Sequence, residues 1–280
     1  MDGEPQTGVT AVGIMPLRRQ PRDASEMVSQ LLLGEMFEIL DSTERWYEIK
    51  AAFDGYRGWV NQNECYVLKS GSYNRWQADK DDNLRFSVWY SFRAYGEDSR
   101  ACTVPPGARF EINDSTIRLP FGEFKISGGL TPLKGQDILQ TARNFLGTPY
   151  LWGGRSDCGI DCSGLIQQVL KLHGWSFPRD SSEQAKAVPL CELKSWNDLA
   201  KGDVLYFNPG GNAITHVGFY LGKGLLLHAS GCVRVQALSR GWEREWEQKY
   251  TLNANLANSI AGYQKLNEIK TLEKTDNYVP

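Results

Sequence analysis

The first part of the chain, residues 1–69, consists of short apolar runs separated by polar turn residues. Runs of this kind, bounded by Gly, Pro, Asp or Ser, are typical of β-strands. They cover residues 9–14, 30–33, 36–40, 46–49, 58–60 and 66–68. Because several short strands follow one another closely, they predict a small all-β barrel.

Residues 70–130 repeat this texture with more polar loops and predict a second all-β unit, and residues 129–135 are interpreted as a linker. The period then changes, and apolar residues recur at helical spacing before strand-like runs begin. The helical stretches cover residues 138–146 and 162–172, and the strand-like runs cover residues 204–207, 216–221, 224–228, 233–235 and 260–263. Helices followed by a sheet predict an α+β domain over residues 131–265. The polar tail, residues 266–280, is expected to fray.

Composition and charge narrow the class of protein. Of the 280 residues, 41% are hydrophobic and 23% are charged, and the net charge is −2. This composition is ordinary for a globular protein, and it lacks the basic surplus of a nucleic-acid-binding protein. The length allows one large domain or two to three small ones. No apolar stretch approaches the roughly 18 residues of a membrane-spanning helix, so we expect no membrane span. The N-terminus has no signal-peptide pattern, so we expect a cytoplasmic protein, or a periplasmic or secreted one if a leader was removed.

Cys162 has the most informative chemical context. It lies in the run Asp-Cys-Ser-Gly at residues 161–164, directly before an apolar helical stretch. A cysteine attacks as the thiolate, and both a helix N-terminus and a nearby imidazole lower the thiol pKa from about 8.5. The chain has six cysteines, too sparse for a disulfide scaffold, and most are interpreted as free thiols. Cys162 is therefore the predicted nucleophile.

Two histidines are candidates for the base that this thiol requires. His216 and His228 lie on strand-like runs joined by Leu-Gly-Lys-Gly at residues 221–224, which favours a hairpin. In a hairpin both rings share one face, so that His216 accepts the proton and His228 orients His216. His173 precedes Gly174 and is interpreted as a helix C-terminal residue without a catalytic role.

Zinc binding is the alternative use of the same side chains. Cys158 and Cys162 could bind zinc together with the two histidines. However, the spacing of these cysteines is not that of a usual zinc knuckle, and no second cysteine pair follows at regular spacing. We expect neither a metal nor an organic cofactor.

These motifs resemble the NlpC-type cell-wall cysteine peptidases, which have a trimmed papain-like fold. The resemblance covers residues 133–264 and keeps the family's motifs in order. The matching segments are Gly-Thr-Pro-Tyr-Leu-Trp-Gly-Gly (147–154), Asp-Cys-Ser-Gly (161–164), Pro-Arg-Asp-Ser-Ser-Glu-Gln (178–184), Gly-Asp (202–203), His-Val-Gly (216–218) and His-Ala (228–229). It implies helices packed on an antiparallel sheet. By this resemblance Cys162 is the nucleophile, His216 the base and His228 the orienting residue, while Tyr150 donates its hydroxyl to the oxyanion.

Members of this family cleave peptidoglycan stem peptides after D-glutamate, at the γ-linked bond to a diamino acid. The resemblance implies four residues of the substrate cleft, Asp161, Ser163, Arg179 and Ser181. Asp161 is expected to hold the free ammonium of an N-terminal L-alanine. Arg179 is expected to bind the α-carboxylate of the glutamate, with a surface ion pair to Asp180 or Glu183 as the structural alternative.

The N-terminal region resembles bacterial SH3-like domains through residues 24–30 and 54–60. The resemblance implies two SH3-like barrels ahead of the peptidase domain. In similar three-domain enzymes the first barrel closes one end of the cleft and supplies an acidic group and a tyrosine to the substrate's free amine. Glu26 and Tyr56 match those positions.

The predicted function is hydrolysis of the γ-D-glutamyl bond to a diamino acid in stem peptides with a free N-terminal L-alanine, which releases L-Ala-γ-D-Glu. The predicted partners are therefore peptidoglycan-derived peptides. Two alternatives stay open, a thiol amidase or acyltransferase acting on another acyl substrate and a wall-binding protein with an inactive catalytic domain. The filled catalytic positions argue against inactivity. The sequence does not distinguish diaminopimelate from lysine in the substrate, and it gives neither the oligomeric state nor the role of the second barrel.

Overall fold

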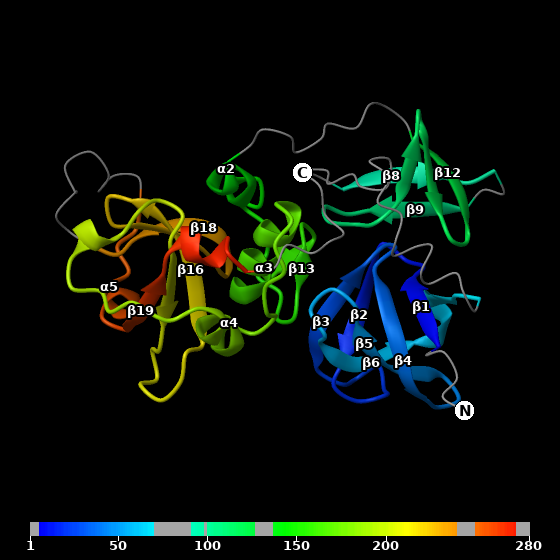
Figure 1. Cartoon of the computed structure of the whole chain (residues 1–280), viewed down its shortest axis with the longest axis horizontal. Coiled ribbons are helices and arrows are strands. Elements are labelled where there is room, and N and C mark those ends of the chain that lie inside the picture. Colours follow the sequence, from blue (N-terminus) through cyan, green and yellow to red (C-terminus); the bar gives the residue numbers. More distant parts are fainter. Residues whose placement is uncertain (1–5, 70–90, 98–99, 127–136, 240–249, 273–280) are drawn as a thin grey trace.

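The structure is a computed structural model that describes residues 6–69, 91–97, 100–126, 137–239 and 250–272. Three units follow one another along the chain (Figure 1). In the described residues the first two are built on β-sheets, and the third combines helices with a sheet. The chain therefore has the predicted α+β fold. The predicted linker at residues 129–135 lies outside the described residues.

The first unit is an antiparallel sheet with strand order β3-β2-β6-β5-β4-β1-β7. Its elements are β1 Thr7–Thr10, β2 Ile14–Arg18, β3 Met27–Leu32, β4 Met36–Ser42, β5 Trp46–Ala51, β6 Arg57–Asn61, the 3₁₀-helix η1 Gln62–Glu64 and β7 Cys65–Val67. The sequence predicts one strand at residues 9–14, but the chain bends there and a separate strand, β2, contains Pro16. Because β2 pairs with β6 only through Arg18, Pro16 interrupts no ladder on that side.

The second unit is a five-stranded antiparallel sheet of order β10-β11-β12-β8-β9. Its strands are β8 Phe92–Tyr95, β9 Ala101–Val104, β10 Glu111–Asn113, β11 Thr116–Leu119 and β12 Gly122–Ile126. Its core includes Phe110 and Ile117 and continues into the first unit, where Val9, Leu33 and Met36 belong to the same cluster. The two β units therefore share buried apolar surface, which favours a fixed arrangement of both.

The third unit packs a central helix on an antiparallel sheet of order β18-β17-β16-β15-β19. Its strands are β13 Arg155–Ser156, β14 Gly159–Ile160, β15 Val204–Phe207, β16 His216–Gly222, β17 Leu225–Ser230, β18 Cys232–Ala237 and β19 Ile260–Gln264. Its helices are α2 Ile138–Arg143, α3 Cys162–Leu172, α4 Ser181–Ala187, η3 Trp196–Asp198, α5 Ala254–Ala257 and α6 Leu266–Ile269. The central helix, α3, has the predicted bounds. It ends at Leu172, with His173 as the capping residue, and Gly174 follows with a φ of 87°, a conformation that glycine adopts without strain.

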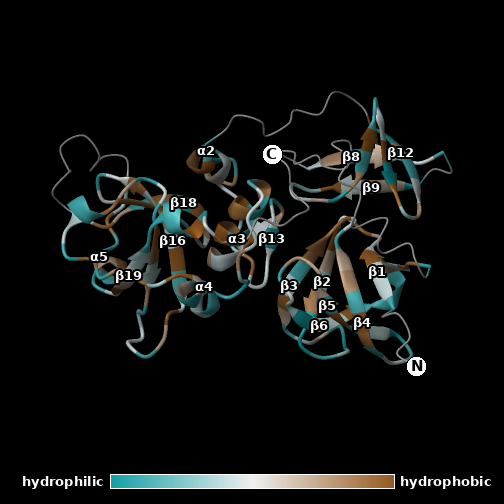
Figure 2. Ribbon diagram, viewed as in Figure 1, coloured by the Kyte–Doolittle hydropathy of each residue, from teal (hydrophilic) through white to brown (hydrophobic). Residues whose placement is uncertain are grey.

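Helix α3 is buried on all sides, because the sheet covers one side and the β units approach the other (Figure 1). Apolar side chains concentrate on α3 and on the strands, whereas α4 is mainly hydrophilic (Figure 2). The polar residues of α3 contact the β units: the Gln167 amide donates to Asp54, the Gln168 amide to the carbonyl of Pro106, and Lys171 pairs with Glu35. These buried polar contacts fix the orientation of α3, and hence of its first residue, relative to the first two units.

The C-terminal residues are more ordered than the sequence predicts. Residues 266–269 form α6, in which Leu266 and Ile269 are buried in the main core of the third unit. In the sequence these two apolar residues stand among polar ones, which gave no helix signal. The prediction of a frayed tail from residue 266 was therefore wrong for this segment. Residues 273–280 lie outside the described residues. Among the helices that the structure describes, none is long and apolar enough to cross a membrane.

Candidate active site

Cys162 is the first residue of α3, and the residue is 6% exposed. The helix starts here because Asp161 caps it, its Oδ1 accepting a hydrogen bond from the amide of Gly164 at 2.7 Å. A Cβ atom at Gly164 would lie 2.2 Å from the carbonyl oxygen of Gly154, so only glycine fits. The motif at residues 147–154 therefore packs against the motif at residues 161–164 at the start of α3, next to Cys162.

The sulfur of Cys162 is surrounded by backbone groups next to a histidine. Sγ lies 4.0 Å from the carbonyl oxygen of Thr215, and the backbone amides of Ser163 and Val217 approach it. Thr215 and Val217 flank His216, the first residue of β16. The candidate nucleophile and the candidate base therefore lie at the junction of α3 with the sheet.

His216 and His228 lie on neighbouring strands of one hairpin, as predicted. Strands β16 and β17 pair antiparallel, and Nε2 of His216 lies 2.7 Å from Nδ1 of His228. The rings meet edge to face, with centroids 5.0 Å apart. Gly218 makes this possible, because a Cβ atom there would lie 2.9 Å from the Cβ of His228. Since Nε2 of His216 is used, Nδ1 is the ring nitrogen left for the sulfur.

The charge states of this pair differ from the sequence-based expectation. Burial, reinforced by the negative charge of Asp161, raises the pKa of Cys162 to about 12. Burial, reinforced by His228, lowers the pKa of His216 to about 3. Both shifts favour a neutral thiol beside a neutral imidazole, so the prediction of a lowered thiol pKa was wrong for the substrate-free site. The amides at the sulfur lower its pKa but do not outweigh burial.

We expect alkylation of Cys162 by iodoacetamide to accelerate continuously with pH. The thiolate fraction grows about tenfold per pH unit below the thiol pKa, so the rate should rise without a plateau between about pH 6 and pH 9. Peptide mapping by mass spectrometry would follow Cys162 against Cys158, which is exposed. A rate at Cys162 that stays constant over this range would instead indicate a preformed thiolate–imidazolium pair.

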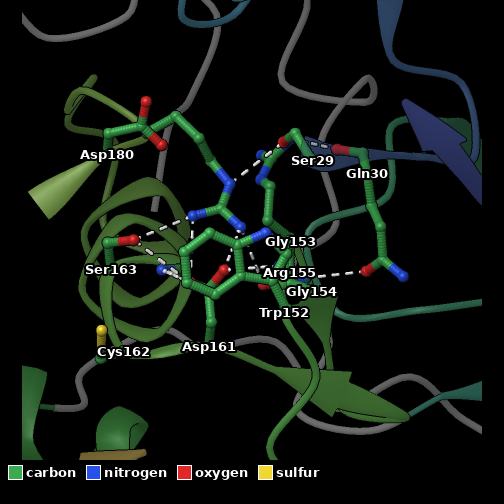
Figure 3. Close-up of polar contacts among 12 residues, drawn as sticks. Ser29, Gln30, Trp152, Gly153, Gly154, Arg155, Asp161, Cys162, Ser163 and Asp180 are labelled. Atoms are coloured by element: carbon green, nitrogen blue, oxygen red, sulfur yellow. Dashed lines mark hydrogen bonds and ion pairs between the residues drawn. The ribbon is translucent and has the colours of Figure 1, made fainter. Parts of the chain in front are cut away.

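A buried ion pair lies beside the nucleophile (Figure 3). Arg179 is 2% exposed, and all five of its N–H groups have acceptors. They donate to both carboxylate oxygens of Asp161, at 3.0 and 2.6 Å, to the hydroxyls of Ser29 and Ser163, and to the carbonyl of Gly154. The pair therefore joins the first β unit to the start of α3.

This network corrects three predictions. The surface ion pair of Arg179 with Asp180 or Glu183 was wrong, since the partner is Asp161. A glutamate carboxylate would find no free N–H on Arg179. The expected contact of Asp161 with an ammonium does not fit either, because its oxygens already accept from Arg179 and from backbone amides on both sides of the site. Ser163 is also part of the network, with its hydroxyl donating to Asp161 at 3.2 Å.

A second set of polar side chains, at the surface, forms hydrogen bonds between the first and third units. The hydroxyl of Tyr56 donates to Oδ2 of Asp180 at 2.9 Å, and the indole N–H of Trp152 donates to Glu26 at 2.9 Å. The guanidinium of Arg19 donates to the other oxygen of Glu26 at 2.6 Å. Asp180 precedes α4 but makes no capping bond with its side chain, which leaves it turned to Tyr56. The predicted residues Glu26 and Tyr56 thus both contact the catalytic unit.

Two other predicted residues lie nearby. Tyr150 is half-buried, and burial, with smaller contributions from Cys162 and Asp161, raises its pKa to about 12. Ser181 is half-buried at the start of α4, directly after Asp180. The roles assigned to both stay predictions.

The sequence missed Asp180, Trp152 and Gln236 as members of the site. Asp180 was weighed only as an ion-pair partner, and Trp152 only as part of a motif. Oε1 of Gln236 lies 2.8 Å from Nε2 of His228. Its only signal is an even spacing from His228 across a β-turn, which places both on one face of a hairpin.

The arrangement gives the zinc alternative no support. Cys158 is exposed on the β13–β14 hairpin, whereas Cys162 is buried at the start of α3. In the part of the chain that the structure describes, no three His, Cys, Asp or Glu side chains are grouped as metal ligands.

Comparisons with known proteins agree with this geometry. The profile of the NlpC/P60 family matches residues 147–254, and that of the bacterial dipeptidyl-peptidase Sh3 domain matches residues 17–64. A gamma-D-glutamyl-L-lysine dipeptidyl-peptidase of Bacillus subtilis (strain 168) is 32% identical over 222 residues, which is 72% of this chain and 71% of the relative. The dipeptidyl-peptidase 6 of Lysinibacillus sphaericus is 27% identical over 76% of this chain and 84% of its own length.

Solved structures share the fold. The crystal structure of an NlpC/P60 family protein from Bacillus cereus ATCC 10987 has a TM-score of 0.71 at 21% identity, covering 92% of this chain and 99% of that chain. An NlpC/P60 endopeptidase from Photobacterium damselae subsp. piscicida also has a TM-score of 0.71, at 15% identity, covering 94% of this chain and 73% of that one.

Proposed function

Because the chain belongs to the NlpC/P60 family of cysteine peptidases, we propose that it hydrolyses the γ-D-glutamyl bond to a diamino acid in stem peptides whose N-terminal L-alanine is free. The products are L-Ala-γ-D-Glu and a peptide that begins with the diamino acid. The names of two relatives support this choice of scissile bond, because both relatives are called gamma-D-glutamyl-L-lysine dipeptidyl-peptidases. For this chain the proposal covers lysine and diaminopimelate alike. We propose that the protein acts in the cytoplasm, where it recycles imported wall fragments.

The chemistry proceeds through a thioester. Nδ1 of His216 accepts the proton of Cys162 while Sγ attacks the γ-carbonyl carbon. The oxyanion is stabilised by the backbone amide of Cys162 and the hydroxyl of Tyr150. Collapse of the tetrahedral intermediate breaks the C–N bond, and the imidazolium of His216 returns its proton to the leaving amine. Water then hydrolyses the thioester, with His216 as the base.

The observation that carries the substrate assignment is the pair Tyr56–Asp180, which bonds across the two units at 2.9 Å. Burial and the charge of Asp180 raise the pKa of Tyr56, so its hydroxyl remains a donor to Oδ2 of Asp180. Among the residues that the structure describes, none donates to Oδ1 of Asp180. Both oxygens of the other predicted residue, Glu26, already accept, one from Arg19 and one from Trp152, so Glu26 acts here by holding these two side chains. The carboxylate of Asp180 and the phenol oxygen of Tyr56 suit an ammonium group, which only donates hydrogen bonds. A peptide extended at its N-terminus would lack this ammonium.

We expect the protein to cleave L-Ala-γ-D-Glu-diaminopimelate or L-Ala-γ-D-Glu-L-Lys at least about 100-fold faster, by kcat/KM, than the N-acetylated peptides. Acetylation removes the positive charge and two of the three N–H donors, and a site that hydrogen-bonds a substrate group rejects an analogue without it strongly. Product masses measured over time would give both rates and the cleaved bond. Equal cleavage of free and acetylated peptides would overturn the free-amine requirement. No cleavage of either would favour the wall-binding alternative, and release of another acyl product would favour the amidase.

Tyr56→Phe separates the amine subsite from the catalytic groups. We expect KM for the free peptide to rise about tenfold with kcat little changed, because the hydroxyl contacts the amine equally in the ground state and in the transition state. The matched control is Tyr47→Phe, a half-buried tyrosine on β5 of the same unit. A fall in kcat alone for Tyr56→Phe would contradict the assigned role.

A further inference from the structure

The two histidines are the beginning of a longer chain of hydrogen bonds. Nε2 of His228 lies 2.8 Å from Oε1 of Gln236 on β18. The same oxygen accepts from Nδ2 of Asn253 at 3.2 Å. Asn253 in turn caps α5, where its Oδ1 accepts from the backbone amide of Leu256 at 3.0 Å. A continuous series of groups thus connects a backbone amide to His216.

The donor and the acceptor of every hydrogen bond in this series follow from the backbone amide of Leu256, at the end remote from His216. A backbone N–H can only donate, so the side chain of Asn253 must present Oδ1 to Leu256 and Nδ2 to Gln236. Gln236 must then present its oxygen, since a flipped amide would place two donors against each other. An oxygen at this position accepts from His228, so the proton of His228 is on Nε2 and its Nδ1 is an acceptor.

The last step concerns the candidate base. Because Nδ1 of His228 accepts, Nε2 of His216 must carry the proton that it donates across 2.7 Å. The lone pair of the neutral His216 ring is then on Nδ1, the nitrogen left for the sulfur. With the opposite tautomer, an N–H would face the thiol, and the proton of Cys162 would have no acceptor.

We propose that Gln236 and Asn253 are positioning residues that fix the tautomer of His216, so that its Nδ1 accepts the proton of Cys162. The inference rests on the proposed roles of Cys162 and His216. When the thiol proton reaches Nδ1, the imidazolium formed keeps its Nε2–H directed to His228, and no other group in the series has to change its proton.

Asn253→Asp is the decisive substitution. Aspartate caps helices as well as asparagine does, so the bond from Leu256 is kept. Its second oxygen, however, is an acceptor facing Gln236. The amide of Gln236 is then expected to flip and donate both to the new carboxylate and to His228, which moves the protons of His228 and His216 to Nδ1. We expect kcat to fall about 10²- to 10⁴-fold, as for other bases held in the wrong tautomer, with KM within about twofold.

Ring ¹⁵N shifts measure the tautomers directly, and they are best recorded in the Cys162→Ala protein and its Asn253→Asp derivative. This measurement needs no turnover, so it tests the series of hydrogen bonds from Leu256 to His216, called the relay below, even if the proposed function fails. We expect both rings protonated on Nε2 before the substitution and on Nδ1 after it. A doubly protonated His216, an Nδ1–H tautomer at the start, or an unchanged tautomer after the substitution would overturn the proposal. So would an unchanged kcat.

Two variants separate the relay from general effects. Gln236→Glu keeps an acceptor at the same place, so the original tautomer should be retained, and its loss would contradict the relay. Asn61→Asp is a matched control, because Asn61 also caps a helix, accepting from the amide of Asn63 at 3.0 Å in the first unit. It should change neither kcat nor the ring spectra. If Asn253→Asp lowers the melting temperature, the starting tautomer and Gln236→Glu still decide the question.

Discussion

Cys162→Ala is expected to abolish hydrolysis of the free stem tripeptide, with a loss in kcat of at least about 10⁴-fold. Removing the nucleophile of a covalent mechanism leaves only the oxyanion donors and substrate binding to act. The fold should persist, because the side chain is small and alanine is favourable in a helix. Activity would be measured by the mass of released L-Ala-γ-D-Glu, and folding by circular dichroism and thermal melting.

Cys158→Ala is the matched control for this substitution. Cys158 lies four positions before Cys162 but is exposed at the β13–β14 hairpin, so its loss should leave turnover unchanged. Turnover retained by Cys162→Ala together with loss in Cys158→Ala would exchange the roles of the two thiols. Turnover retained in both would refute a cysteine nucleophile altogether.

The backbone of the catalytic unit was largely predictable because its signals are local. Helical spacing and Gly174 define α3, and a Gly-Lys-Gly turn defines the β16–β17 hairpin. The hairpin has a side-chain period of two, so it also predicts that His216 and His228 meet on one face. The bend before β2 was missed because the apolar run at residues 9–14 continues from the end of β1 through the bend to the start of β2.

The polar contacts of the site were less predictable, because their partners are distant in sequence. Asp161 and Arg179 are 18 positions apart, and Tyr56 and Asp180 are 124 apart. Charge alone offered Arg179 several acidic neighbours, and only the packing of three elements selects Asp161. Burial had a similar effect on Cys162: the helix N-terminus predicted a lowered thiol pKa, but desolvation raises it.

Arg179→Met is expected to cause the largest loss of stability in the catalytic unit. The side chains of Arg179 and Asp161 are 1% and 9% exposed, so the substitution leaves a buried carboxylate without its countercharge. Breaking a buried pair in this way costs about 3–5 kcal/mol. For a unit of this size we expect the melting temperature to fall by roughly 10 °C, measured by differential scanning calorimetry.

Adding Asp161→Asn to Arg179→Met should recover part of this loss, since no charge is then buried and the amide oxygen can still accept from Gly164, while the bond from the amide of Gly153 is lost. A double variant no more stable than Arg179→Met would show that lost packing and lost hydrogen bonds, and not the uncompensated charge, dominate. Arg118→Met is the matched control, because Arg118 pairs with Glu123 at 2.9 Å on the surface of the second unit. Solvent screens that exposed pair, so its loss should leave the melting temperature of the catalytic unit unchanged. The contrast would tie the stability of the site to the same buried pair that connects the start of α3 to the first unit.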